Sequence, residues 1–146
     1  MGTTFSAYDI RGRAGDNISV EYAWTVGKAF SEWVSDEGLI VVGTVGQADS
    51  SIARGFVEGV LLQGRDVIGV GAGDANEQAI RVMIADRRAA GAALISHDGI
   101  QGIEIIALYD ANGAPIRSEN GLVSINELAE SDNFLPAATK GTILSV

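Results

Sequence analysis

The fold class is indicated most clearly by residues 19–43, SVEYAWTVGKAFSEWVSDEGLIVVG. From Ser19 to about Glu37 the apolar side chains recur at spacings of three and four, which predicts an amphipathic helix with Ser19 as its N-cap. Gly38 ends that helix, and the apolar run at 39–42 is typical of a strand buried on both faces. A helix that leads directly into a buried strand indicates an α/β fold.

The same alternation of helix and strand continues toward the C-terminus. The pattern predicts a helix from Asp49 or Ser50 to about Gln63 and another from Glu77 to about Arg88. A short apolar strand follows each helix, at 67–70 and at 92–95. Strands separated by helices of this length favour a parallel sheet that is covered on both faces.

The strand predicted at 102–109 breaks this alternation. Only a few residues separate it from the strand at 92–95, too few for a helical crossover, so the two strands should form an antiparallel hairpin. A turn at 110–113 and a last short helix at 122–131 follow. We therefore predict a three-layer α/β/α sandwich with a mixed, mostly parallel sheet.

Length and composition fit one globular domain. The chain has 146 residues, of which 47% are hydrophobic and 20% charged. We assign residues 1–135 to the domain and residues 136–146 to an exit linker or a C-terminal tail.

The net charge of −9 disfavours nucleic acid and anionic membranes as partners. With no cysteine and one histidine, thiolate chemistry and multi-histidine metal sites are excluded. The sequence shows neither a signal peptide nor a membrane span, so we expect a cytoplasmic location.

Ligands of open α/β sheets bind at the carboxyl ends of the strands, which the segments 43–50, 71–76 and 96–101 reach. The last of these places a hydroxyl, Ser96, beside an imidazole, His97. Adjacent residues of an extended chain point apart, so the two are not a nucleophile and base pair by themselves. A capped loop with a solvated histidine is the alternative interpretation.

A second polar cluster lies near the N-terminus, in the segment from Tyr8 to Gly12. The guanidinium of Arg11 suits bidentate binding of a phosphate. The alternative is a surface pair between Arg11 and Asp9, with Gly12 in a turn.

Several stretches match, in order, the motifs of one known enzyme family. FSAYDIRG at 5–12 is close to an FRAYDIRG opening, and EYAWTVGKAFSEW at 21–33 resembles the first helix of that family. Ser96 and His97 fall at the T-A-S-H-N-P loop, whose serine is the phosphorylated catalytic residue. GIEIIALYDANGAPI at 102–116 is similar to the NGIK strand and its DxxGxPI continuation. The chain thus resembles the N-terminal domain of the phosphoglucomutase/phosphomannomutase (α-D-phosphohexomutase) family.

The resemblance implies that Ser96 carries a phosphoryl group, that Arg11 steadies it, and that His97 assists orientation or proton transfer. The reaction implied is the interconversion of hexose 1-phosphate and hexose 6-phosphate through a bisphosphate. Mg²⁺ would be bound by another domain, so no metal ligand is expected within this chain except Ser96 as phosphoserine. A hexose phosphate is accordingly an expected partner only of a complete enzyme.

The chain departs from the family at the functional edge. G-R-D-S-R is replaced by the sequence GTVGQ at 43–47, and the Asn-Pro that follows the serine loop is replaced by Asp98-Gly99. The lysine of NGIK is replaced by Glu104, whose carboxylate is expected to repel a phosphoserine. Two interpretations stay open: the first domain of a longer, active intramolecular phosphotransferase, or a noncatalytic binding or assembly domain. On either, catalysis by the isolated chain is not expected, and homo-oligomerisation is.

Overall fold

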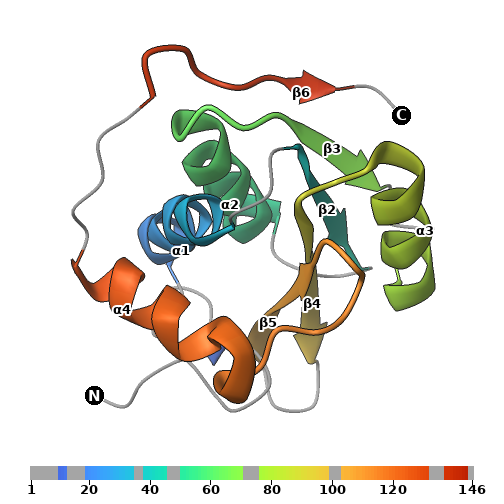
Figure 1. Ribbon diagram of the computed structural model, residues 1–146. Coiled ribbons are helices and arrows are strands. Elements are labelled where there is room, and N and C mark those ends of the chain that lie inside the picture. The colour runs from blue at the N-terminus through green and yellow to red at the C-terminus, as the bar shows by residue number, and fades with distance from the viewer. Residues whose placement is uncertain are drawn as a thin grey trace.

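A computed structural model describes residues 10–12, 19–34, 38–45, 50–70, 76–98, 103–131 and 137–144 of the chain. The strands form one six-stranded sheet in the order β1-β5-β4-β2-β3-β6 (Figure 1). They are β1 (Ile10–Gly12), β2 (Ile40–Thr44), β3 (Val67–Val70), β4 (Gly91–Asp98), β5 (Ile103–Asp110) and β6 (Ile143–Leu144). The helices are α1 (Val20–Trp33), α2 (Ser50–Leu62), α3 (Glu77–Arg87) and α4 (Val123–Ser131), the last preceded by a kinked turn at Ser118–Leu122.

The sheet is mixed and mostly parallel, as predicted. β2 pairs in parallel with β3 and β4, and β3 pairs in parallel with β6. β5 runs antiparallel to both of its neighbours, β4 and β1, which confirms the predicted hairpin of β4 and β5. Because β1 and β4 both oppose β5, the two strands run in the same direction. Their carboxyl ends therefore lie at the same edge of the sheet as that of β2.

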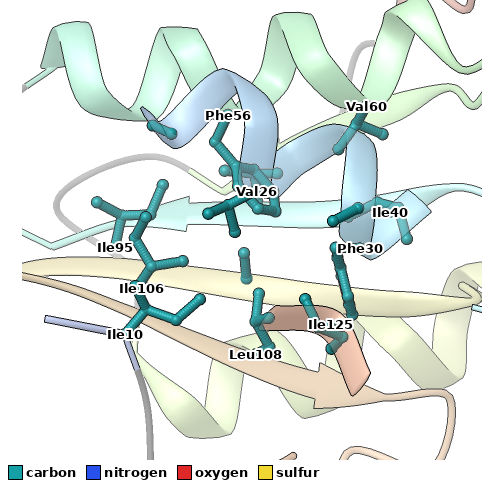
Figure 2. Packing of buried hydrophobic residues seen from close by; sticks show 14 of the residues in the cluster. Ile10, Val26, Phe30, Ile40, Phe56, Val60, Ile95, Ile106, Leu108 and Ile125 are labelled. Carbon is teal, nitrogen blue, oxygen red and sulfur yellow. The ribbon is translucent and has the colours of Figure 1, made fainter. Parts of the chain in front are cut away.

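Helices cover both faces of this sheet. α1, α2 and α4 pack on one face and α3 on the other (Figure 1). In the larger core, Phe30 of α1 and Phe56 of α2 pack together with ring centroids 6.2 Å apart, above Leu108 and Ile95 of the sheet (Figure 2). All four side chains are fully buried, and each contributes about 1.5–3 kcal/mol by leaving water. The predicted three-layer α/β/α sandwich is confirmed.

The helices α1 and α2 touch through their backbones. A Cβ atom added at Gly59 would lie 2.1 Å from the carbonyl oxygen of Trp24, and one added at Gly27 would lie 2.2 Å from that of Phe56. Because a side chain has no room at either position, only glycine permits this approach. The contact fixes the position of α2, which follows the carboxyl end of β2 in the chain.

Helix α1 ends at Trp33, earlier than the sequence predicts. The guanidinium of Arg65 donates to three backbone carbonyl oxygens near that end, at 2.8 to 3.0 Å: those of Ser31, Val34 and Gly38. These bonds satisfy carbonyls that have no partner within the helix and hold the connection to β2. Residues 35–37, also predicted to be helical, lie outside the described residues.

Residues 137–144 lie along the sheet, whereas the sequence predicts an exit linker or a tail over 136–146. The Gly141 N–H donates to the carbonyl oxygen of Leu61 at 2.8 Å, and β6 then pairs with β3 as the edge strand. This packing requires glycine, because a Cβ atom at Gly141 would lie 1.9 Å from the carbonyl oxygen of Arg65. The domain boundary itself stays a prediction.

Candidate functional site

The carboxyl ends of β1, β2 and β4 meet at one edge of the sheet, where the sequence predicts a ligand site. The loops that follow β2, β3 and β4 lie largely outside the described residues, and so do Gln47, Gly99 and the predicted partner of Arg11, Asp9. The described part of the site is formed by the ends of β1, β4 and β5.

Ser96 lies inside β4, although the sequence predicts that this strand ends at Ile95. The strand is longer because its pairing with β5 continues residue by residue to Asp98. Ser96 is half-buried and shares its face of the strand with Leu94, which packs in the α3 cluster. The Ser96 side chain therefore projects from the face of the sheet that α3 covers, close to the carboxyl end of β4.

Arg11 is the central residue of β1 and is exposed. It pairs with Ile105 of β5, and Ile105 pairs on its other side with Ser96. Residues directly opposite one another in a sheet project from the same face, so Arg11 and Ser96 flank Ile105 on the α3 face. Two strand spacings separate their backbones by roughly 10 Å. The fold thus brings Arg11, predicted to bind a phosphate, close to Ser96, predicted to carry it, although the two are 85 positions apart in the sequence.

His97 projects from the opposite face of β4, because side chains alternate along a strand. Its Nδ1 contacts the Oε2 carboxylate oxygen of Glu104, the residue directly opposite it on β5. The Glu104 side chain is only 2% exposed and that of His97 is 30% exposed. His97 therefore lies in a strand and not in a capped loop, and its exposed ring is also the partner that a buried carboxylate needs. The prediction that Ser96 and His97 do not form a nucleophile and base pair is confirmed.

Sequence reasoning missed this pair. It treats Glu104 as a charge that repels a phosphate on Ser96, yet the carboxylate lies on the other face of the sheet and contacts an imidazole. The repulsion itself stays a prediction, and the structure adds the contact with His97 that the sequence did not suggest. The residues at hairpin positions 97 and 104 become neighbours only when the register of the two strands is known, and that register follows from the turn.

The arrangement offers three chemical groups at one edge: a hydroxyl, a guanidinium and an imidazole held by a carboxylate. A hydroxyl accepts a phosphoryl group, a guanidinium binds its oxygens, and an imidazole moves protons. Among the residues that the structure describes, no three histidine, aspartate or glutamate side chains gather as a metal site.

A hollow with a volume of about 520 Å³ lies between the N-terminal half of α1 and the middle of α2. Its lining is mostly apolar and is formed by Val20, Glu21, Trp24, Arg54, Gly55 and Glu58. These residues include neither a hydroxyl nor an imidazole. The edge formed by β1, β4 and β5 is therefore the better candidate for phosphoryl chemistry.

Comparisons with known proteins find similar sequences among phosphomannomutases. No family model matches the chain. Phosphomannomutase of Escherichia coli is 27% identical over 158 residues, which cover 99% of this chain and 32% of that protein. A phosphomannomutase of Klebsiella pneumoniae is also 27% identical over 158 residues, covering 99% of this chain and 92% of that protein.

The fold agrees as well. The crystal structure of a phosphoglucomutase/phosphomannomutase family protein from Burkholderia thailandensis superposes with a TM-score of 0.82 at 19% identity, over 97% of this chain and 32% of that one. The chain thus spans about a third of the length of the Escherichia coli and Burkholderia proteins.

Proposed function

We propose that this chain, a divergent relative of the phosphoglucomutase/phosphomannomutase family, carries a phosphoryl group on Ser96 and holds it with Arg11. The phosphoryl group would come from a hexose bisphosphate and pass to a hexose monophosphate, as in an intramolecular phosphotransferase. The chain would supply the phosphoserine part of such a site. A complete mutase would need further residues to recognise the sugar, so the isolated chain should turn over little or no hexose phosphate.

One observation carries this proposal: Arg11 and Ser96 project from the same face of the sheet on either side of Ile105. A phosphoryl group on Ser96 adds a dianion at a point toward which the long side chain of Arg11 can extend. The guanidinium offers two parallel N–H donors to two phosphate oxygens. Such a contact stabilises the charge of the phosphoryl group as it is transferred.

In the proposed site, Mg²⁺ would be bound mainly by residues of another domain. Magnesium prefers oxygen ligands, and the buried carboxylate nearest to the site, that of Glu104, contacts His97 on the far face. Within the described residues, a phosphorylated Ser96 is therefore the one ligand that we assign to it. Bound there, the ion would supply charge neutralisation at the phosphoryl oxygens.

Two further properties belong to the same proposal. No helix among the described residues has both the length and the apolar character needed to cross a bilayer. The two phosphomannomutases compared above are bacterial, and we infer a cytoplasmic location for this chain. We also infer a homo-oligomer, which light scattering at micromolar concentration tests directly; a monomer would contradict it.

The test of the phosphoserine is a mass measurement. The purified chain is incubated with glucose 1,6-bisphosphate and its intact mass and phosphopeptides are recorded. We expect one added phosphoryl group, located on Ser96, and none in Ser96→Ala. The matched control is Ser124→Ala, which removes an exposed serine on α4 and should leave the modification unchanged. An unmodified wild-type chain that is folded by circular dichroism would count against the proposal.

A noncatalytic binding or assembly domain is the second candidate. It is favoured by Glu104, which stands where the family motif has a lysine and whose buried carboxylate contacts His97. On this alternative the chain stays unmodified by the bisphosphate, and neither Ser96 nor Arg11 affects its association with a partner.

A further inference from the structure

We propose that the open edge of β6 pairs with β6 of a second copy of this chain, so that two sheets join into one across a twofold axis at Ile143. The inference rests on the homo-oligomer inferred above and deepens it, because it names the surface through which two copies meet. It does not depend on a phosphoryl group at Ser96.

The strand β6 leaves one side of its backbone open. It is the last strand of the sheet in the part of the chain that the structure describes (Figure 1). Ile143 lies opposite Val67 of β3, and the Val67 N–H donates to the carbonyl oxygen of Thr142 at 3.0 Å. Because alternate residues of a parallel strand turn their N–H and C=O groups to the same neighbour, those of Ile143 point away from β3. The edge therefore offers a donor and an acceptor to another strand.

The side chain and the charge at this edge also suit a second copy. Ile143 is 65% exposed, more than any other large apolar side chain among the described residues. The sequence around it, GTILSV at 141–146, contains no charged residue, although the net charge of the chain is −9. Two copies that meet along this strip bury apolar surface without bringing like charges together.

The other edge of the sheet is different. β1 carries the exposed side chain of Arg11 at its centre, and Asp9 and Arg13 flank the strand in the sequence. Charged side chains commonly protect edge strands, because a charge resists burial against a second strand. We therefore assign the association to β6 rather than to β1.

A twofold axis at Ile143 makes the contact self-complementary, because the same residue of both copies lies at its centre. In an antiparallel pair of this kind each Ile143 N–H donates to the carbonyl oxygen of the other copy, and the two Cα atoms lie about 5.5 Å apart. A disulfide spans Cα separations of roughly 4.4–6.8 Å. A cysteine at this position should therefore crosslink the two copies.

The chain has no cysteine, so a single substituted cysteine reports this pairing directly. Under mild oxidation we expect Ile143→Cys to form a covalent dimer faster than Val82→Cys by roughly tenfold or more, since paired strands hold the two thiols in place. Val82 is the matched control, because it is an apolar residue on α3 that is 53% exposed. Equal rates of crosslinking in the two variants would overturn the proposal.

Ile143→Pro separates the interface from the fold. Proline removes an N–H that points away from β3, and an edge strand tolerates proline at such a position. We expect this variant to keep the circular dichroism spectrum and the urea midpoint of the wild type while its mass, by light scattering at micromolar concentration, falls from that of a dimer to that of a monomer. Ile143→Lys, which leaves the backbone unchanged, should do the same, whereas Val82→Lys should stay dimeric.

The outcomes distinguish this interface from the homo-oligomer itself. If the wild type and both Ile143 variants are dimers, the homo-oligomer stands and the β6 interface is wrong. If the wild type is a monomer, both fail, and the open edge is left to a strand of a different protein.

Discussion

The α1 and α2 layer and the end of the β4–β5 hairpin differ in what holds them together. In the helix layer, Gly59 lets the two backbones touch, and Phe30 and Phe56 fill the core beneath. At the hairpin end, Ser96 and Arg11 are polar and at least partly exposed. If the proposed function holds, separate residues carry the stability and the chemistry. Substitutions in the helix layer should unfold the chain, whereas those at the hairpin end should change what it does.

The largest loss of stability is expected for Gly59→Ala. The new methyl group would lie 2.1 Å from the Trp24 carbonyl oxygen and 2.9 Å from the Lys28 nitrogen, both backbone atoms that cannot turn aside. The helices must separate, and we expect the free energy of unfolding to fall by about 3 kcal/mol, the upper part of the range for overpacking. Urea titration followed by circular dichroism measures this change.

Gly69→Ala is the matched control for that experiment. Its added Cβ atom would meet only the Val42 carbonyl oxygen, at an ordinary 3.9 Å, and Gly69 is exposed on β3. Stability should change by less than about 1 kcal/mol, because alanine fits the strand there. Equal losses in the two variants would show that the contact between α1 and α2 is not what makes Gly59 special.

The next largest effect is expected for Arg65→Met, which keeps an apolar stem but removes the guanidinium. Three backbone carbonyls at the end of α1 lose their donor, and charged hydrogen bonds of this kind contribute about 2 kcal/mol. Arg87→Met, an exposed change in the last turn of α3, should cost much less. Equal unfolding midpoints for the two variants would mean that Arg65 does not anchor the helix end.

At the hairpin end, His97→Ala should destabilise the chain more than Glu104→Gln does. The first change leaves a carboxylate that is 2% exposed without its imidazole, at an expected cost of about 1.5 kcal/mol. The second removes the charge together with the need to compensate it. The double variant should then be more stable than His97→Ala alone, which a double-mutant cycle measured in urea detects. Strict additivity would contradict a direct coupling between the two side chains.

The sequence predicts the scaffold well because its signals are local. The periodicity of α1 and its cap are confirmed, since the Tyr22 N–H donates to the Ser19 side-chain oxygen at 3.0 Å. The features that were missed join residues through strand pairing or through packing between elements. Arg65 reaches the end of α1, Gly141 brings the C-terminal segment onto the sheet, and Glu104 meets His97 across a hairpin. None of these contacts leaves a periodic pattern, because each depends on the register of packed elements.

For the site, the family resemblance implies that Arg11 acts with Ser96, whereas the contact of His97 with Glu104 was not predicted. Arg11 and Ser96 came from motifs, and the sequence alone placed each beside its own neighbour, Asp9 or His97. Strand pairing groups them differently, with Arg11 and Ser96 on one face and His97 with Glu104 on the other. Alternation along β4 could be anticipated, whereas the place of β1 beside β5 could not, because β1 is only three residues long.

The smallest effect on stability, and the largest on chemistry, is expected for Ser96→Ala. The side chain is half-buried at the end of a strand, and alanine keeps its volume nearly unchanged, so the free energy of unfolding should change by no more than about 0.5 kcal/mol. The same variant should lose all labelling by glucose 1,6-bisphosphate, because among the described residues Ser96 is the hydroxyl that shares a row of the sheet with Arg11. Arg11→Met, which keeps Ser96, should be labelled more slowly at unchanged stability.

These two variants sharpen the contrast with the helix layer, because function is removed while the fold is kept. Differential scanning calorimetry and intact mass, recorded on the same samples, give both quantities at once. A Ser96→Ala protein that melts several degrees below the wild type would show that the serine supports the hairpin. Ser96 would then stabilise the fold, as Gly59 does, and the proposal that the hairpin end carries the chemistry but little of the stability would be wrong for Ser96.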